Sequence, residues 1–536
     1  MKWNIPWNLT RSDLARSDLA ARLTGYLDGW GGPVLAALLA LLLCIWTFDP
    51  KLSLSGDNGE FITLARSLAS GQGLTYTHLP LPQVATKFPP GFPLLLAPAA
   101  ALFETSSWAG YGIRDFTVMK WIVVLIFTGS AACLFLLSRD LSNSGRATVT
   151  TLVAVSNPLI VSYGYQVMSE VPYIMWSLLS LWLLHRGLAR TGWRENGWLW
   201  SGIAAMILAY YTRTIGICLI AAVVTHLAIH RDWRRMLAVG AVSVAAILPW
   251  SIRNSQAGGN AYMQDLFLRN PYRPDEGYLD AVGMLLRMKI HLVEYVSVSL
   301  PETILPAFAR ASDVLSGLGF VIVLLGIATI VQCVRRRRHS LIVIYAAFFI
   351  GTLLIWPWSG TRFILPLVPL LIFLAVDSIT EGILWIRGHI LACSARAVAA
   401  MALLLMLAVN VDALNRYARF SKVGYPREWR TYFEAGLWLR TMTPSDVIVG
   451  CRKALLMHVV SGRRTTTFAF TKPQALLADL RRQRVNYVVV DQIGYSQTEE
   501  FLVPAILTAK DHFREMHRTG DPETWIIYYD ETQPGQ

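Results

Sequence analysis

Residues 53–98 read SLSGDNGEFITLARSLASGQGLTYTHLPLPQVATKFPPGFPLLLAP and lie between the first two long apolar stretches of the chain. Four ionisable side chains stand out in this otherwise apolar or small-residue sequence: Asp57, Glu60, His78 and Lys87. An ionisable group close to a bilayer is costly to keep there and usually marks a functional site. The stretch therefore predicts a site in the loop that joins the first two membrane-embedded segments.

The composition of the whole chain agrees with a membrane protein. Of its 536 residues, 54% are hydrophobic and 15% are charged, whereas a soluble domain carries about 25% charged residues. The net charge is +13, but Lys and Arg occur in short clusters between apolar runs. This is the positive-inside pattern, and it indicates a membrane rather than a nucleic-acid partner. The six cysteines show neither a disulfide framework nor the spacing of a zinc site.

Eleven apolar runs approach the roughly 20 residues that cross a bilayer. They lie at 31–48, 117–137, 147–163, 171–187, 199–213, 214–229, 237–250, 314–333, 341–357, 363–384 and 397–413. A further run, 91–103, is shorter and contains Pro93 and Pro98. If this run does not cross the membrane, the basic loops that follow it lie on the same side as the N-terminus. If it does cross, the loops just after it lie on the opposite side. The positive-inside rule therefore predicts that 91–103 is an interfacial or re-entrant element on the outer side.

This topology predicts a polytopic α-helical membrane protein of about eleven transmembrane helices. It comprises a cytosolic segment at 1–30, a transmembrane domain at 31–415 with outer loops at 49–116 and 251–312, and an extracytoplasmic domain at 416–536. In the last of these, EWRTYFEAGLWLRTM and PQALLADLRRQR have helical spacing, while DVIVGC, VNYVVVD and ETWIIYYD resemble strands. We expect a small α/β domain with its own core.

Asp57 and Glu60 begin the first outer loop, and each has two interpretations. Asp57 is suited to accept a proton from an attacking hydroxyl, while SGDNGEF followed by ITLARSLASGQG also fits a helix N-cap with a glycine end. If a helix has already begun at Asp57, Glu60 lies on the same helical face. The two carboxylates are then expected either to divide the roles of general base and positioning residue, or to bind a divalent cation together. A first-turn Glu favoured by the helix dipole is the alternative. No other cofactor is expected.

Lys87 opens the motif KFPPGFP, in which a rigid Pro-Pro step follows the lysine. Its ammonium group either holds a lipid phosphate as a point charge or extends to the headgroup level without a specific partner. Tyr76 and His78, in TYTHLPLP, are further candidates for substrate binding. A lone loop histidine is more often structural than catalytic.

Glu170, in YGYQVMSEVPY, starts a span at the outer face on the same side as Asp57. A glutamate at a helix start is common, but one beside the membrane on this side is expected to line the cavity. Arg213, in YYTRTIGICL, and Arg362, in WPWSGTRFILPLVPLL, are solitary arginines between apolar segments. Arginine is costly in lipid unless it reaches the interface or meets an anion, so Arg362 is either an interfacial anchor or a phosphate contact.

Several nucleotide-dependent and hydrolytic motifs are missing from the sequence. It contains no GxxxxGK[ST], no HExxH and no GxSxG. An enzyme that works outside the cell without nucleotides needs an activated substrate that arrives through the membrane. A polyprenyl-phosphate sugar meets this need, because its glycosyl-phosphate bond is activated and its tail lies in the bilayer.

The order of these features resembles the polyprenyl-phosphate-sugar-dependent membrane glycosyltransferases of the C-type fold, among them the protein O-mannosyltransferases and the lipid A aminoarabinose transferases. The shared order is a span, an outer-loop Asp, a polar loop ending in Lys-aromatic-Pro-Pro, an outer Glu before a later span, and RFILPLVP. The resemblance covers roughly residues 30–415, and an outer α/β tail is common in the bacterial relatives.

The resemblance implies roles for four residues. Asp57 matches the catalytic Asp of the first loop, and Lys87 matches the lysine at the donor phosphate. Glu170 matches the acidic position of the second loop, and His78 a histidine near the donor. The family often has Glu directly after the Asp and a tyrosine four residues after it, whereas this chain has Asn at 58 and Phe at 61. The tandem acid pair is therefore missing.

We therefore expect an inverting glycosyltransferase of the cytoplasmic (inner) membrane. It takes a sugar from a polyprenyl-phosphate carrier and transfers it, at the outer face, to an acceptor hydroxyl of a lipid, glycan or protein. One alternative is a flippase or secondary transporter of lipid-linked sugars, although these proteins often have internal repeats, which this sequence does not show. A glycan ligase or polymerase is the other alternative.

Overall fold

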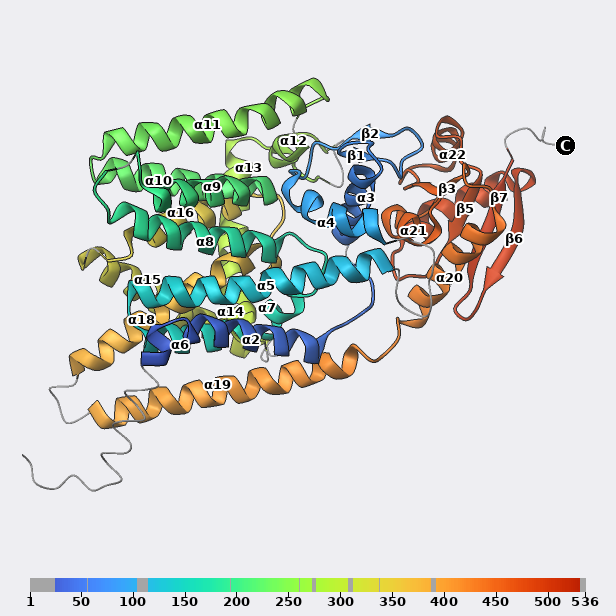
Figure 1. Cartoon of the computed structure of the whole chain (residues 1–536). Coiled ribbons are helices and arrows are strands. Elements are labelled where there is room, and N and C mark those ends of the chain that lie inside the picture. The colour runs from blue at the N-terminus through green and yellow to red at the C-terminus, as the bar shows by residue number, and fades with distance from the viewer. Residues whose placement is uncertain are drawn as a thin grey trace, which may run out of the picture.

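A computed structural model describes residues 25–530, except residues 55, 104–113, 193, 260, 272–275, 307–311, 337 and 387–391. The predicted cytosolic segment at 1–30 lies almost wholly outside the described residues. The chain forms a body of packed helices with a smaller α/β domain beside one end (Figure 1).

The helical body is built from α-helices that follow one another with few strands between them. In chain order they are α2 (Gly31–Thr47), α3 (Gly56–Ala69), α4 (Gly91–Leu102), α5 (Arg114–Leu141), α6 (Ser144–Val155), α7 (Pro158–Tyr163), α8 (Glu170–Leu188), α9 (Gly197–Thr212), α10 (Ile217–Ile229), α11 (Trp233–Gln256), α12 (Ala261–Phe267), α13 (Ala281–Glu294), α14 (Leu300–Ile304), α15 (Ser312–Arg335), α16 (Ser340–Ile355), α17 (Thr361–Ile364), α18 (Val368–Ile386) and α19 (Ala392–Phe420). Two short strands, β1 (Thr75–Tyr76) and β2 (Gln83–Val84), form an antiparallel hairpin in the first loop.

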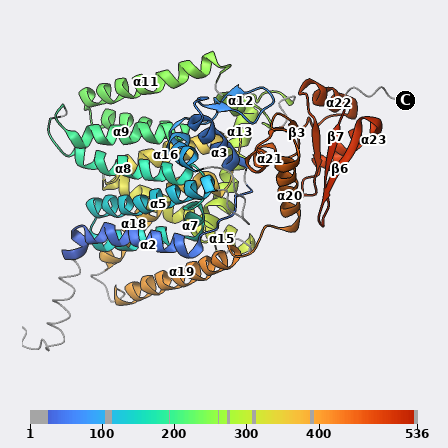
Figure 2. The same ribbon diagram turned by 45° about the vertical axis from the view of Figure 1, so that its right-hand side comes forward.

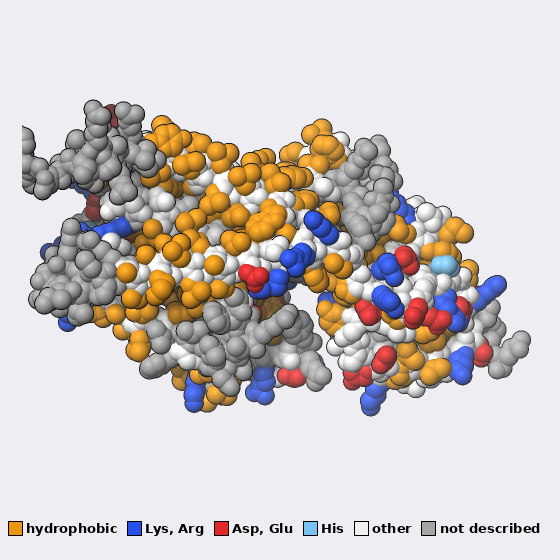
Figure 3. All heavy atoms as spheres, turned by 90° about the horizontal axis from the view of Figure 1, so that it is seen from below, with side chains coloured by type: hydrophobic (Ala, Val, Ile, Leu, Met, Phe, Trp, Pro, Cys, Tyr) orange, Lys and Arg blue, Asp and Glu red, His pale blue; other side chains and the backbone are white. Residues whose placement is uncertain are grey.

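Within the described residues, four helical stretches are long and apolar enough to cross a membrane. They are Phe116–Leu141, Trp233–Gln256, Thr361–Ile383 and Ala397–Phe420, and several shorter apolar helices pack beside them. Hydrophobic side chains cover most of the helical body in the view of Figure 3, as expected of a surface that faces lipid. The count of eleven spans stays a prediction.

The structure divides one of the predicted spans and shows a short helix at 91–103. The predicted span 147–163 is divided into α6 and α7, because Asn157 caps a new helix by accepting the backbone N–H groups of Leu159 and Ile160. The run 91–103 forms the twelve-residue helix α4. At 1.5 Å per residue α4 is about 18 Å long, too short to cross a hydrocarbon core of about 30 Å.

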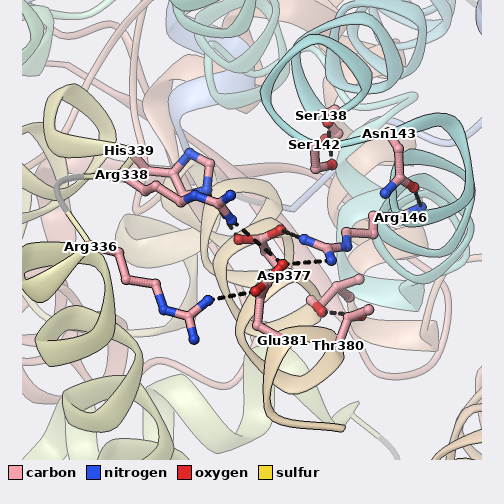
Figure 4. A network of polar contacts seen from close by, with 11 residues as sticks. Ser138, Ser142, Asn143, Arg146, Arg336, Arg338, His339, Asp377, Thr380 and Glu381 are labelled. Atoms are coloured by element: carbon pink, nitrogen blue, oxygen red, sulfur yellow. Dashed lines mark hydrogen bonds and ion pairs between the residues drawn. The ribbon is translucent and has the colours of Figure 1, made fainter. Parts of the chain in front are cut away.

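The loops predicted to lie inside gather at the end of the helical body away from the α/β domain. Arg146, at the start of α6, forms ion pairs with Asp377 and Glu381 of α18 (Figure 4). Arg336 also binds Glu381, and Nε2 of His339 lies 3.1 Å from Asp377. Loops that are distant in sequence therefore share one face, while the first loop and the α/β domain lie at the opposite end (Figure 1).

The C-terminal domain contains a five-stranded mixed sheet with the order β4-β3-β5-β7-β6. Strand β3 is parallel to β4 and β5, and the remaining pairs are antiparallel. Its elements are α20 (Arg427–Met442), β3 (Ile448–Gly450), α21 (Ala454–Ser461), β4 (Arg464–Thr466), α22 (Pro473–Arg482), β5 (Tyr487–Val490), α23 (Val503–Thr508), β6 (Phe513–Thr519) and β7 (Thr524–Tyr529). The two helices and three strands expected from the sequence are all present, while the boundary predicted at 415/416 falls inside α19.

The C-terminal domain packs directly against the first loop. Helix α21 lies between α3 and strand β3 in both Figure 1 and Figure 2. A Cβ atom added to Gly59 of α3 would lie 3.1 Å from Cβ of Leu455 in α21, so the two helices are in close contact at that point. The backbone N–H of Thr465 in β4 donates to the carbonyl of His78 at 2.6 Å. The domain thus closes over the loop that carries Asp57.

Candidate active site

Glu170 is the most deeply buried charge at the end of the helical body beside the C-terminal domain. It is the first residue of α8, and its side chain has no exposed surface. Its Oε1 atom accepts Nη1 of Arg213 at 2.7 Å and Nε of Arg362 at 2.5 Å. Its Oε2 atom is buried without a hydrogen-bond partner among the described residues. Two guanidinium groups therefore hold one oxygen of Glu170, and the other is buried without a hydrogen bond from any described residue.

Arg362 joins Glu170 to Asp57. Nη2 of Arg362 lies 2.5 Å from Oδ2 of Asp57, whose side chain is 26% exposed. Asp57 is the second residue of α3, where the positive end of the helix favours a carboxylate. Its Oδ1 atom makes no hydrogen bond or ion pair within the described chain. Asp57 thus keeps one oxygen for a substrate while the other is fixed by Arg362.

Glu60 and Lys87 form the fourth ion pair of the site. Nζ of Lys87 lies 3.9 Å from Oε2 of Glu60, and the Tyr76 hydroxyl donates to Oε1 of Glu60. Burial raises the pKa of Glu60, and the positive charge of Lys87 opposes that rise. The Lys87 side chain is 31% exposed, so its long contact with Glu60 leaves the ammonium group accessible to a second anion.

Seven of the eight residues that the sequence predicts for the site therefore lie in one cluster. We call this cluster the charged site, and it comprises Asp57, Glu60, Tyr76, Lys87, Glu170, Arg213 and Arg362. Its three carboxylates and three cations come from five separate parts of the chain. Their formal charges balance, so the cations are already oriented and partly satisfied by carboxylates of the same site.

His78 is the exception, because it turns towards the C-terminal domain. Its ring lies 5.8 Å from the ring of His458 in α21, and it is 6% exposed. The centroid of the Tyr76 ring is also 5.8 Å from that of the His78 ring, so His78 connects the site to the domain contact. Burial lowers the pKa of His78 to about 3 and that of His458 to about 4.

These two histidines predict an acid-sensitive contact between the first loop and the C-terminal domain. Both are neutral in the folded protein above about pH 4, whereas an unfolded histidine takes up a proton below about pH 6.5. Acidification from pH 7 to pH 5 therefore favours unfolding, by about 1 kcal/mol per pH unit for each histidine. We expect the midpoint of thermal unfolding to fall over this range, and to fall less in a His78→Asn/His458→Asn variant. The exposed His230→Asn is the control, and equal losses in all three proteins would contradict the expectation.

Two tyrosines that the sequence did not single out as site residues border the charged site. The charges of Arg213, Asp57, Glu60 and Arg362 act on the hydroxyl of Tyr262 in α12, and the charges of Glu170, Arg362, Arg213 and Asp57 act on that of Tyr163 at the end of α7. The Tyr262 ring also contacts Phe88, next to Lys87, at 5.9 Å. No motif in the sequence around Tyr163 or Tyr262 distinguishes these two tyrosines from the other aromatic residues of the outer loops.

The carboxylates of the charged site do not fit a divalent cation. Glu170 already accepts two guanidinium groups, Asp57 accepts one, and Glu60 binds Tyr76 and Lys87. Across the described residues, no three His, Cys, Asp or Glu side chains are grouped so that they could hold a metal ion. The positive charge of the site is carried by Lys87, Arg213 and Arg362.

Comparisons with known proteins agree with the fold that the sequence predicts. Residues 87–252 match the family model of dolichyl-phosphate-mannose-protein mannosyltransferase, a segment that contains Lys87, Glu170 and Arg213. The structure of ArnT from Cupriavidus metallidurans bound to undecaprenyl phosphate superposes with a TM-score of 0.59 and 15% identity, covering 94% of this chain and 99% of ArnT. The chain has the C-type glycosyltransferase fold. No curated protein matches it in sequence.

Two further structures with this fold are oligosaccharyltransferases of Archaeoglobus fulgidus. One is tethered to an acceptor peptide and matches with a TM-score of 0.58, 13% identity, and coverage of 93% of this chain and 74% of that enzyme. The other, AglB in complex with an inhibitory peptide and a dolichol-phosphate, matches with a TM-score of 0.57, 12% identity and the same coverage. The resemblance to C-type-fold glycosyltransferases is thereby confirmed at the level of the fold.

Proposed function

We propose that the chain is an inverting glycosyltransferase that takes a sugar from a polyprenyl-phosphate carrier. It acts at the outer face of the cytoplasmic membrane, with the N-terminus in the cytosol and the C-terminal domain outside. The observation that supports this best is the charged site, in which Arg362 bridges Asp57 and Glu170 beside Arg213 and Lys87. Lipid phosphates bound to ArnT and AglB support the same kind of donor.

In the proposed reaction the acceptor hydroxyl attacks the anomeric carbon of the donor sugar. The bond between that carbon and the phosphate oxygen breaks, the configuration inverts, and polyprenyl phosphate leaves with both electrons of the bond. Oδ1 of Asp57, which has no partner among the described residues, receives the hydroxyl proton. Lys87 holds the phosphate and stabilises the charge that it gains as it leaves.

Arg362 links proton uptake by Asp57 to the departure of the phosphate. It binds Asp57 and Glu170 through different nitrogen atoms. Once Asp57 takes up the proton its charge is lost, and the attraction between Asp57 and Arg362 weakens. The guanidinium group is then available to the leaving phosphate at the moment when the phosphate becomes more negative. Glu170 keeps Arg362 in place throughout, because its carboxylate remains ionised between two arginines.

The test uses the full chain in sealed vesicles supplied with a labelled polyprenyl-phosphate sugar and an extract of cell-envelope acceptors. We expect label to move from the lipid to a product with the opposite anomeric configuration. Retention of the donor's configuration would contradict the inverting mechanism. Movement of intact lipid-linked sugar across the bilayer without consumption would contradict the enzyme and favour the flippase. Mass analysis of envelope glycans with and without the protein then identifies the acceptor.

A further inference from the structure

A second group of cations and rings lies at the edge of the C-terminal sheet. Strands β3 and β5 are parallel, so the residues that follow them, 451–453 and 491–497, emerge at the same edge. Because β3 leads directly into α21, which packs on α3, this edge adjoins the helical body (Figure 2). In open sheets of this kind, ligands bind outside the carboxyl ends of the parallel strands.

Arg452 and Lys453 at this edge lie over aromatic rings. The Arg452 guanidinium carbon is 5.0 Å from the Phe470 ring and 4.7 Å from the Tyr495 ring. Its Nε donates to Oε1 of Gln497 at 3.0 Å, and Nζ of Lys453 is 4.2 Å from the Tyr495 ring. We call these five residues the basic-aromatic edge.

The basic-aromatic edge is only partly satisfied by the protein itself. Phe470 and Tyr495 remain 43% and 38% exposed. Neither Arg452 nor Lys453 forms an ion pair with a carboxylate of the described chain. Asp491, whose charge interacts with Arg452 at longer range, is buried, and its oxygens accept the Ile493 N–H and the Thr498 hydroxyl. Two cations without a carboxylate partner in the described chain and two partly exposed rings thus form a basic, aromatic patch on the surface of the domain.

The basic-aromatic edge adjoins the charged site. Lys453 stands two residues before Leu455, and Leu455 contacts Gly59, which stands two residues after Asp57. The backbone N–H of Lys453 is held by the Tyr432 hydroxyl at 3.2 Å, which fixes this short connection to α20. A ligand on the edge therefore lies near the contact between α21 and α3, the helix that carries Asp57.

We propose that the basic-aromatic edge binds the acceptor and that the acceptor is an anionic glycan, carrying phosphate or carboxylate groups on its sugars. This inference rests on the proposed function and assigns the acceptor class to it. The exposed parts of the Tyr495 and Phe470 rings offer apolar contact to a sugar, and Arg452 and Lys453, which lie over these rings, bind its anionic group. A neutral sugar or a peptide hydroxyl makes no use of the two cations.

The test uses the full chain in phosphatidylcholine nanodiscs with glucose 6-phosphate, glucuronate and glucose as probes, measured by saturation-transfer difference NMR. We expect the two anionic sugars to bind and glucose to bind at least about tenfold more weakly, as the loss of a charge-assisted hydrogen bond implies. The Arg452→Gln/Lys453→Gln variant should lose that preference, and Arg452→Lys/Lys453→Arg should retain it. Lys510→Gln/Arg514→Gln, which removes two cations from the far side of the sheet, is the control. Equal binding of glucose, or an unchanged preference in the Gln variant, overturns the inference.

Two further measurements separate this inference from the proposed function. The Gln variant should still bind polyprenyl-phosphate sugar, whereas Lys87→Met should lose the donor and keep the anionic probes. A chain that binds the probes through the edge but never binds the donor would overturn the proposed function and keep an anionic-glycan site. Stronger competition by octyl glucuronide than by tetragalacturonate supports a lipid-anchored glycan, and the reverse supports a polysaccharide. The thermal midpoint of each variant must match that of the wild type.

Discussion

Replacement of Asp57 by Asn is expected to lower the rate of sugar transfer by about 10²–10⁴-fold, the usual contribution of a general base. The amide cannot accept the hydroxyl proton, although it can still accept a hydrogen bond from Arg362, which now lies 2.5 Å from Oδ2 of Asp57. Donor binding should change little, because Lys87 and Arg213 are intact. The measurement is kcat/KM for transfer in vesicles, with donor affinity determined separately.

Asp412→Asn is the matched control for this variant. Asp412 is an exposed carboxylate on α19 that pairs with Arg416 one helical turn away. It is distant from the charged site in sequence and contacts none of its members. Its removal should leave transfer unchanged. Wild-type transfer by Asp57→Asn would exclude Asp57 as the base and leave it a positioning role towards Arg362.

Replacement of Glu170 by Gln is expected to destabilise the protein as well as slow transfer. Glu170 is fully buried and neutralises Arg213 and Arg362 through one oxygen. Removing one member of a buried ion pair typically costs about 3–5 kcal/mol, because the partner charges stay buried without compensation. Transfer should fall too, since Arg362 loses the anchor that directs it towards Asp57. The measurements are thermal unfolding by tryptophan fluorescence and transfer in the same preparation.

A second substitution distinguishes loss of charge balance from a general packing defect. Glu170→Gln/Arg213→Gln restores the balance of charges in the site, so part of the lost stability should return, with a coupling of about 0.5–3 kcal/mol. Glu499→Gln, which removes an exposed carboxylate of the C-terminal domain, should have no effect. If the double variant is destabilised by the sum of the two single changes, the ion pairs do not hold the site together.

The charges of the site were predictable because each stands alone in an apolar context. Glu170, Arg213 and Arg362 are isolated ionisable residues at the ends of hydrophobic runs, and the cost of burying them indicates a partner. What the sequence did not show is which partner each one has. Their pairing depends on how α8, α9 and α17 pack, a long-range property that local spacing does not contain.

His78 and Tyr262 illustrate the opposite case. His78 is expected near the donor by resemblance, which stays a prediction. The structure adds a contact between its ring and that of His458, some 380 residues later, because the C-terminal domain folds back onto the first loop. Tyr262 was not expected at all, since α12 lies in an outer loop without a distinctive motif. Both positions are decided by the packing of separate segments against the loop that carries Asp57.

The strands missed in the C-terminal domain are the two edges of its sheet. Strand β3 is completely buried and reads as an apolar run, so it was visible. Strands β4 and β6 are the outermost strands, and β6 (FREMHRT) is mostly polar and exposed. Edge strands commonly carry charges that discourage pairing with other chains, and these charges hide the strand pattern. The interior strands of the sheet are apolar and were therefore easier to predict than its edge strands.

The contact between Gly59 and Leu455 means that the tail of this protein is not an interchangeable module. The helix that carries Asp57 packs so closely on the tail that a Cβ atom at Gly59 would lie 3.1 Å from Cβ of Leu455, closer than an ordinary van der Waals contact. A chimaera that joins this helical body to the tail of a distant relative should therefore lose its catalytic geometry unless the incoming helix reproduces the fit. We therefore expect the effects of substitutions at Gly59 and Leu455 on stability to depend on each other.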